Sequence, residues 1–279
     1  SIGNNSTLSF NASRQLTING TYSQTNGTVN LNTGTMTAKG NWSKSGGTFN
    51  TGTGTMQFNG TSGQTITEGS GSTFYNVTIS NGNNISLASN LTVSNSLLFT
   101  TGKLILNGWT LNLNGTVSGM TSSNAIRGSS TSNISIGGTG ALGNLFLDAT
   151  TPGTTNLLAQ CTINRTSSGT VVLGSDVYIG NTLTLTNGIL QTGSNKMVMN
   201  AGTTLNRTNG YVNGNLQKNV ATGATSRTFE IGDANYYTPV SISFGNVTTA
   251  GDLMLSTSTP LSSHPAIGSF ALSSTSAVN

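Results

Sequence analysis

The chain has 279 residues, of which Lys and Arg contribute 10 and Asp and Glu contribute 6, so charged residues make up 6% and the net charge is +4. Soluble domains carry about 25% charged residues; here Asn, Thr, Ser and Gly replace them. The few basic residues do not cluster with aromatic residues, which argues against a nucleic-acid groove. No apolar run approaches the ~20 residues of a membrane span. Such a polar, weakly charged chain suggests an extracellular or cell-surface protein.

The commonest local pattern is a pair of apolar residues separated by one polar residue and bounded by Gly or Asn. This alternation predicts short strands with two side chains on one face and Thr, Ser or Asn on the other. Such pairs are Leu8/Phe10, Leu16/Ile18, Val29/Leu31, Met56/Phe58, Val77/Ile79, Ile85/Leu87, Leu91/Val93, Leu97/Phe99, Leu104/Leu106, Leu111/Leu113, Ile134/Ile136, Leu145/Leu147, Val177/Ile179, Leu183/Leu185 and Met197/Met199.

The pairs recur at intervals of about twenty residues, a period typical of solenoids. The series are Leu16/Ile18, Met36/Ala38, Met56/Phe58, Val77/Ile79 and Leu97/Phe99; Leu91/Val93 and Leu111/Leu113; and Val177/Ile179 and Met197/Met199. The prediction is an all-β fold: a parallel β-helix over residues 1–215, with three strands per coil and roughly ten coils. Parallel crossovers are generally right-handed, so we expect a right-handed coil. Aliphatic columns would fill the interior, and Asn, Thr and Ser ladders would line the exterior.

Two segments interrupt this register, residues 119–132 and residues 148–160. Both are rich in Ser, Thr and Gly, and the second contains Pro152. We expect longer turns that project from the rod at these places. Loops on a rigid scaffold are where a binding site would be placed.

The pattern changes near residue 216. Three of the four prolines, Pro239, Pro260 and Pro265, lie beyond it, and the apolar alternation becomes longer. This indicates hairpin-connected antiparallel strands. The interpretation is a domain boundary at 215/216, followed by a partial antiparallel β-sandwich over residues 216–279 that has too few strands to be complete.

Four motifs in this order resemble the large β-helical surface proteins of the Bacteroidota. They are residues 183–190 (LTLTNGIL), 210–214 (GYVNG), 229–233 (FEIGD) and 237–240 (YTPV). The resemblance covers nearly the whole chain. It implies an exported, adhesin-type repeat protein with a β-sandwich after the coils, and it implies no catalytic residues. The chain departs from the pattern after Asn279, where similar proteins continue into further sandwich strands.

The acidic residues are too sparse for the clusters that polysaccharide lyases and hydrolases use on β-helices. Asp148 and Asp176 lie about a coil and a half apart in the expected register, so we expect them on different faces. Glu230 and Asp233 are close in sequence and are interpreted as a solvated strand end. We therefore predict no catalytic residues, no metal site and no cofactor.

The single cysteine, Cys161, lies in an alternating stretch and is expected to point into the core without reactivity. The single histidine, His264, precedes Pro265 and is expected at the surface. Neither residue has a partner in sequence that would form a catalytic pair.

The leading functional hypothesis is a non-catalytic structural or adhesive surface rod that self-associates. The open ends of a β-helix carry unpaired backbone groups that invite strand addition, which would produce a filament. The predicted assembly surface is Leu8, Phe10, Phe229, Ile231, Val240 and Ile242. The partners would be further copies of the chain or neighbouring domains of a longer one.

The alternative is a module that binds or cleaves carbohydrate. The groove would then lie between the loops near residues 120–132 and 148–160, and Trp42 and Trp109 are the candidate glycan contacts. A sugar-stacking platform needs two or three aromatic residues on one outer face, and isolated tryptophans more often pack at a corner or an end of the coils. Thr-x-Thr ladders of ice-binding solenoids are not repeated on successive coils.

Overall fold

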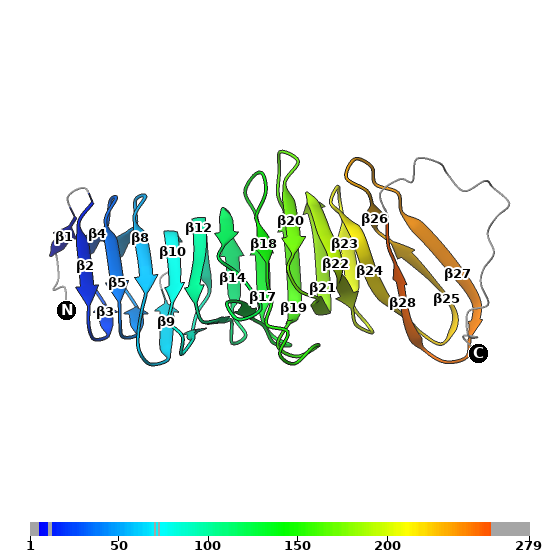
Figure 1. Ribbon diagram of the computed structural model, residues 1–279, viewed down its shortest axis with the longest axis horizontal. Coiled ribbons are helices and arrows are strands. Elements are labelled where there is room, and N and C mark those ends of the chain that lie inside the picture. The colour runs from blue at the N-terminus through cyan, green and yellow to red at the C-terminus, as the bar shows by residue number, and fades with distance from the viewer. Residues whose placement is uncertain (1–5, 11–12, 70, 72, 258–279) are drawn as a thin grey trace.

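The computed structural model describes residues 6–10, 13–69, 71 and 73–257, and these residues form an all-β chain. Figure 1 shows an elongated rod with β1 (Thr7–Ser9) at one end and β27 (Val240–Val247) at the other. The rod is a parallel β-solenoid of about 11 turns with roughly 20 residues per coil, which confirms the predicted fold class. Within the described ranges, no helix has the length and apolar character needed to span a bilayer.

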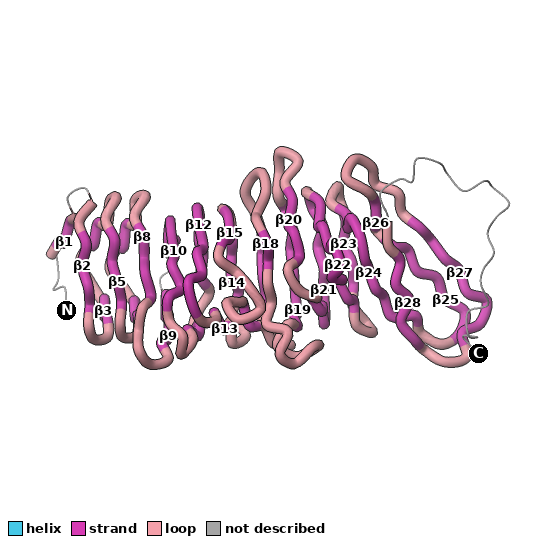
Figure 2. The backbone as a smooth tube through the Cα atoms, in the orientation of Figure 1, coloured by secondary structure: helices cyan, strands magenta, loops and turns pink. Residues whose placement is uncertain are grey.

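The coils stack into lateral sheets whose strands run side by side along the rod (Figure 2). The first sheet contains β1, β4 (Thr28–Asn30) and β7 (Thr48–Asn50). A second contains β3 (Tyr22–Gln24), β6 (Trp42–Lys44), β9 (Gln64–Glu68), β11 (Ile85–Leu87), β13 (Leu104–Ile105) and β16 (Ile126–Arg127).

The longest sheet runs the whole length of the rod. It contains β2 (Gln15–Ile18), β5 (Thr35–Ala38), β8 (Thr55–Phe58), β10 (Thr73–Ser80), β12 (Leu91–Thr101), β14 (Thr110–Leu113), β15 (Thr116–Ser118), β17 (Asn133–Ile136), β18 (Asn144–Leu145), β19 (Leu157–Asn164), β20 (Thr170–Leu173), β21 (Val177–Asn187), β22 (Ile189–Met199), β23 (Thr204–Arg207), β24 (Tyr211–Val220), β26 (Ile231–Gly232) and β28 (Gly251–Leu255). Some long strands bend at a corner of the coil and pair with a different strand on each side of the bend. For example, β12 pairs with β14 near its start and with β15 further along.

The predicted columns are confirmed by the strand register. Leu16 pairs with Met36, Met36 with Met56, Met56 with Val77 and Val77 with Leu97. The pairings of Leu91 with Leu111 and of Val177 with Met197 are also as expected. Most of these side chains are fully buried, so each coil covers the apolar face of its neighbours.

The predicted amide ladders line the exterior. Asn50 Nδ2 donates to Asn30 Oδ1 at 2.7 Å, and Asn187 Nδ2 donates to Asn164 Oδ1 at 2.8 Å. Asn209 continues the second ladder by donating to Asn187 Oδ1 at 3.2 Å. The outer surface is therefore held from coil to coil by uncharged groups, which explains how the rod tolerates so little charge.

The first coils have an aromatic interior, which corrects the proposed surface role of Trp42. The Trp42 ring stacks on Tyr22 with centroids 4.0 Å apart and an angle of 12°, and it meets Phe49 and Phe74 edge-on. Trp42 is fully buried, and its Nε1 donates to a carboxylate oxygen of Glu68. A buried indole needs such a polar partner, and the inward register of β6 places the ring in the core, where a glycan cannot reach it.

The two interruptions of the register have different structures. Residues 119–132 are not one projecting loop, because they contain β16, whose Ile126 pairs with Leu104 and is fully buried. Residues 149–156 do form a turn-rich loop that leaves the coil before β19 begins at Leu157. The first prediction was wrong for β16 because a two-residue strand gives almost no periodic signal.

The C-terminal segment adds antiparallel pairing to the parallel stack. β24 pairs in parallel with β22 along one edge. On its other edge it pairs in parallel with β26 and then antiparallel with β28. β25 (Gly223–Phe229) and β27 form a separate antiparallel pair. The boundary predicted at 215/216 therefore falls inside a continuous strand, and only these antiparallel strands support the expected sandwich. Residues 258–279, with His264, lie outside the described residues.

Candidate functional site

The N-terminal end of the rod presents a recess of about 300 Å³. Its lining residues are Leu8, Ser9, Phe10, Arg14, Gln15 and Leu16. Leu8 is 39% exposed, whereas Phe10 is 6% exposed and packs in the core. Of the two residues predicted for an assembly surface here, Leu8 is exposed at the end of the rod, whereas Phe10 is buried, which corrects its assignment to a contact surface.

The predicted assembly residues at the other end divide in the same way. Val240 is 40% exposed and Ile242 is half-buried, both on β27. Phe229 and Ile231 are buried in the core, which corrects their assignment to a contact surface. Ile231 is buried because β26 pairs with Val212 in the last parallel coil, so its side chain continues the interior column.

Trp109 has an exposed side chain, with an exposed fraction of 41%. It follows the turn after β13, where its N–H donates to the carbonyl oxygen of Leu106. The ring is isolated from Trp42, so the two tryptophans do not form a joint glycan platform. A contact between Trp109 and a glycan stays a prediction.

A groove of about 340 Å³ lies on the side of the rod, and we call it the loop groove. It is lined by Ser122, Phe146, Leu147, Ala149, Pro152, Asn156, Gly174, Ser175, Asp176 and Asn195. Ser122 belongs to the first interrupted segment, and Ala149, Pro152 and Asn156 belong to the second. The two segments singled out from the sequence therefore line one groove.

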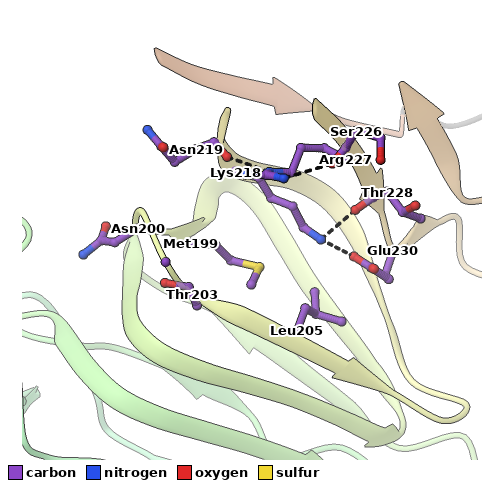
Figure 3. Close-up of a pocket in the computed structure, with 11 residues that line it drawn as sticks. Met199, Asn200, Thr203, Leu205, Lys218, Asn219, Ser226, Arg227, Thr228 and Glu230 are labelled. Carbon is purple, nitrogen blue, oxygen red and sulfur yellow. Dashed lines mark hydrogen bonds and ion pairs between the residues drawn. The ribbon is translucent and has the colours of Figure 1, made fainter. Parts of the chain in front are cut away.

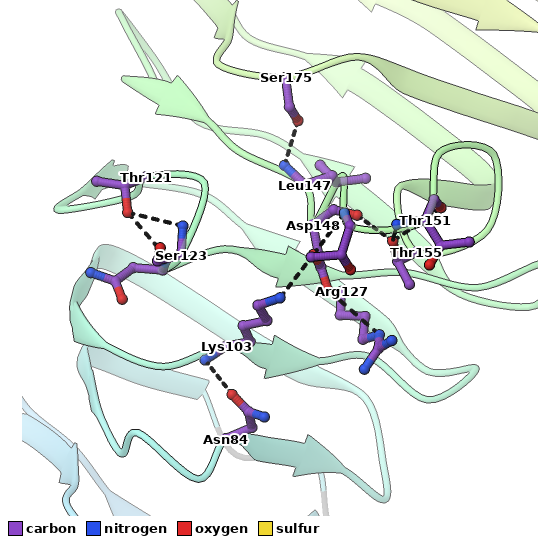
Figure 4. A network of polar contacts seen from close by, with 12 residues as sticks. Asn84, Lys103, Thr121, Ser123, Arg127, Leu147, Asp148, Thr151, Thr155 and Ser175 are labelled. Atoms are coloured by element: carbon purple, nitrogen blue, oxygen red, sulfur yellow. Dashed lines mark hydrogen bonds and ion pairs between the residues drawn. The ribbon is translucent and has the colours of Figure 1, made fainter.

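A polar network at Asp148 supports this groove (Figure 4). Lys103 Nζ lies 2.8 Å from Asp148 Oδ1, Arg127 Nε lies 3.6 Å from Oδ2, and the Asp148 side chain is fully buried. Burial alone would raise the pKa of Asp148, but hydrogen bonds from Lys103 and Thr150 lower it overall. The Thr155 hydroxyl donates to the Asp148 carbonyl oxygen at 2.5 Å. Asp148 therefore holds the side chains of Lys103 and Arg127, and its carbonyl oxygen holds the 149–156 loop against the coil.

Asp148 and Asp176 lie in consecutive coils, because Leu145 pairs with Leu173 and Leu157 pairs with Tyr178. The 149–156 loop lengthens this coil, so the two aspartates are one coil apart rather than the coil and a half that a uniform period gives. The Asp176 side chain borders the loop groove, whereas the Asp148 side chain is enclosed by its partners.

A second polar recess of about 310 Å³ lies where the last coils meet β25 (Figure 3). Lys218 Nζ donates to the Thr228 carbonyl oxygen at 2.6 Å and to Glu230 Oε2 at 2.5 Å. Burial lowers the pKa of Lys218, and Glu230 acts in the opposite direction. Glu230 is therefore an ion-pair partner that ties β24 to the chain after β25, rather than the solvated strand end expected from sequence.

Among the described residues, no group of three or more His, Cys, Asp and Glu side chains could hold a metal ion. Cys161 is buried as expected, and burial raises the pKa of its thiol to about 12.

Comparison with known proteins finds no matching family model, no matching curated protein and no matching solved structure. The resemblance to Bacteroidota surface proteins therefore stays a prediction.

Proposed function

We propose that this chain is a non-catalytic structural or adhesive protein of the cell exterior whose copies join end to end by strand addition. One observation carries the proposal: both ends of the rod bear strands that pair along one edge only within the described residues. At one end β2 pairs with β5 alone, and at the other β27 pairs with β25 alone.

The free edge of β2 is ready to pair. The Arg14 and Ile18 carbonyl oxygens accept the N–H groups of Thr35 and Lys39 from the next coil. Because backbone groups alternate along a strand, those of Thr17 point the other way, toward the open end. An incoming strand would find donors and acceptors there beside the half-buried side chains of Leu16 and Ile18.

Neither terminal strand carries a charged residue or proline, although the pairing of β27 with β25 has a register shift between Gly223 and Thr225. Natural edge strands are protected by charged residues, proline, bulges or covering segments. The sequences of β2 (QLTI) and β27 (VSISFGNV) contain no charged residue and no proline. The eight residues of β27, with Val240 exposed, are long enough to pair with the four-residue edge of β2 in another copy.

The lateral surface supports a role outside the cell. It is held by uncharged amide and hydroxyl ladders, and the whole chain has 16 charged side chains from its 10 basic and 6 acidic residues. A rod of this kind resembles a spacer or support more than a carrier of reactive groups. Surface location is tested by labelling intact source cells with antibodies against the rod.

The substitution Thr17→Pro tests end-to-end joining. It removes an N–H that points to the open end and leaves the bonds between β2 and β5 in place. We expect sedimentation velocity to show large assemblies for the unaltered chain and single rods for Thr17→Pro. Thr17→Val keeps the N–H and should assemble normally. Equal assembly by all three proteins, with equal melting temperatures, would contradict strand addition at β2.

A further inference from the structure

The loop groove has the features of a small-molecule site on an otherwise closed rod. Its volume of about 340 Å³ is at the lower end of the range of roughly 300–1,000 Å³ for ligand pockets. Such pockets combine an apolar floor with a few placed polar groups. Phe146, Leu147 and Pro152 supply apolar surface, and Asp176 and Asn195 supply polar groups.

The Phe146 ring is held in place by a glycine in the next coil. A Cβ added at Gly174 would overlap the ring atoms of Phe146, so the ring lies directly over the backbone there. Phe146 is partly buried and still borders the groove. The ring is therefore a fixed, flat, apolar surface open to a ligand on the groove side.

Two polar side chains at the rim have hydrogen-bonding capacity to spare. Within the described residues Asp176 accepts one hydrogen bond, from the N–H of Lys196 to Oδ1, at 2.9 Å. Asn195 donates from Nδ2 to the Leu173 carbonyl oxygen at 2.9 Å, which leaves its Oδ1 open. The remaining oxygens, Asp176 Oδ2 and Asn195 Oδ1, are hydrogen-bond acceptors, so the rim suits a ligand that carries hydroxyl donors.

The 149–156 wall of the groove is organised before any ligand binds. Asn156 Oδ1 accepts the Gly153 N–H at 2.8 Å, and Asn156 Nδ2 donates to the Asp176 carbonyl oxygen at 2.9 Å. The Asn156 side chain is fully buried, so it connects the loop to the following coil. A prearranged wall reduces the entropy lost on binding.

We propose that the loop groove binds a neutral saccharide, with one sugar-ring face on Phe146 and hydroxyl groups on Asp176 and Asn195. A pyranose has an apolar C–H face and a hydroxyl edge, which match the floor and the rim. Asp176 is the charged side chain that borders the groove within the described residues, and it disfavours acidic sugars. Lys103 and Arg127 do not line the groove, and both are paired with Asp148. This site is separate from both ends of the rod.

Affinity electrophoresis tests the proposal, with the purified chain run through gels that contain neutral β-glucan, xylan, mannan or galactan, or acidic alginate or polygalacturonate. We expect retardation by at least one neutral polymer. Phe146→Leu keeps apolar volume but removes the flat ring, and it should weaken binding about tenfold. Asp176→Asn should weaken it by at least about tenfold, because a charged acceptor is lost.

Tyr236→Ala is the matched control, because it removes an exposed aromatic residue that does not line the groove. It should leave retardation unchanged, and the melting temperature of each variant shows whether the fold is intact.

No retardation by any polymer would overturn the proposal. Retardation by acidic polymers alone, lost in Arg127→Gln, would also overturn it. The same holds if retardation by neutral polymers survives both Phe146→Leu and Asp176→Asn. Single rods retain the loop groove, so Thr17→Pro should bind the neutral polymers as the unaltered chain does. The assembly proposal and the saccharide proposal are therefore tested separately.

Discussion

Arg165 Nη1 donates a hydrogen bond of 3.0 Å to the carbonyl oxygen of Gly115, which lies 50 residues earlier in the chain. The same guanidinium donates to the carbonyl oxygens of Gly137, Thr139 and Gly140 and is 1% exposed. Burial lowers the pKa of Arg165. One buried cation thus joins successive coils through backbone carbonyl groups.

Replacing Arg165 with Met should destabilise the rod by about 3 kcal/mol or more, because several buried carbonyl oxygens would lose their donor. Urea denaturation gives the free energy of unfolding. Lys39→Met, at an exposed position, is the control and should change stability by less than about 0.5 kcal/mol. A similar small effect of Arg165→Met would show that water satisfies these carbonyl groups equally well.

Gly102 lies where one coil passes over the one before it. Its φ is +87°, and an added Cβ would overlap the carbonyl oxygen of Asn81. Gly102→Ala should therefore cost about 2 kcal/mol or more, from backbone strain and displacement of the coil. Gly20→Ala, where a Cβ would meet open space, should be nearly neutral. Equal melting temperatures for the two variants would contradict this packing.

Stability should depend on pH through Asp148. Its pKa is lowered in the folded chain from the ordinary value of 3.8, so the contribution is present above about pH 3.8 and is lost as pH falls through the lowered pKa. Asp148→Asn should therefore lower stability by about 1–3 kcal/mol at pH 7, and the difference should shrink in acid. Denaturation curves from pH 2 to 7 measure it, with Asp252→Asn as an exposed control. A difference that is constant over this range would argue against the ion pair.

Cys161 should be inert in the folded rod. Its thiol is buried and its pKa is raised to about 12, so almost no thiolate forms at neutral pH. An aromatic disulfide reagent should label the chain only after denaturant is added. Stoichiometric labelling within minutes in native buffer would mean that this coil opens readily.

Periodicity predicted the parts of this fold that repeat. The columns from Leu16 to Leu97 were correct because each coil between them has nearly the same length. The separation of Asp148 and Asp176 was overestimated, at a coil and a half instead of one coil, because the 149–156 loop lengthens one coil and no sequence rule gives the path of such a loop. An isolated alternating pair does not reveal which side faces inward, so Phe229 was assigned to an assembly surface although it is buried; Trp42, a candidate glycan contact under the alternative hypothesis, is buried as well.

The loop groove could be predicted only in part. The composition of the two interrupted segments indicated where a groove would form, because turn-rich residues break the register. Phe146 and Gly174 were not identified, since their contact depends on how two coils stack rather than on any local motif. Arg165 was likewise missed, because nothing near it in sequence indicates backbone carbonyl partners.

End-to-end joining is tested most directly by negative-stain electron microscopy of the purified native protein over a dilution series. About 11 coils at ~4.8 Å each give a rod near 50 Å long, to which the C-terminal strands add. We predict long fibres with a subunit repeat of about 50–70 Å, which shorten on dilution and are absent for Thr17→Pro. Dispersed single rods at every concentration would contradict end-to-end assembly.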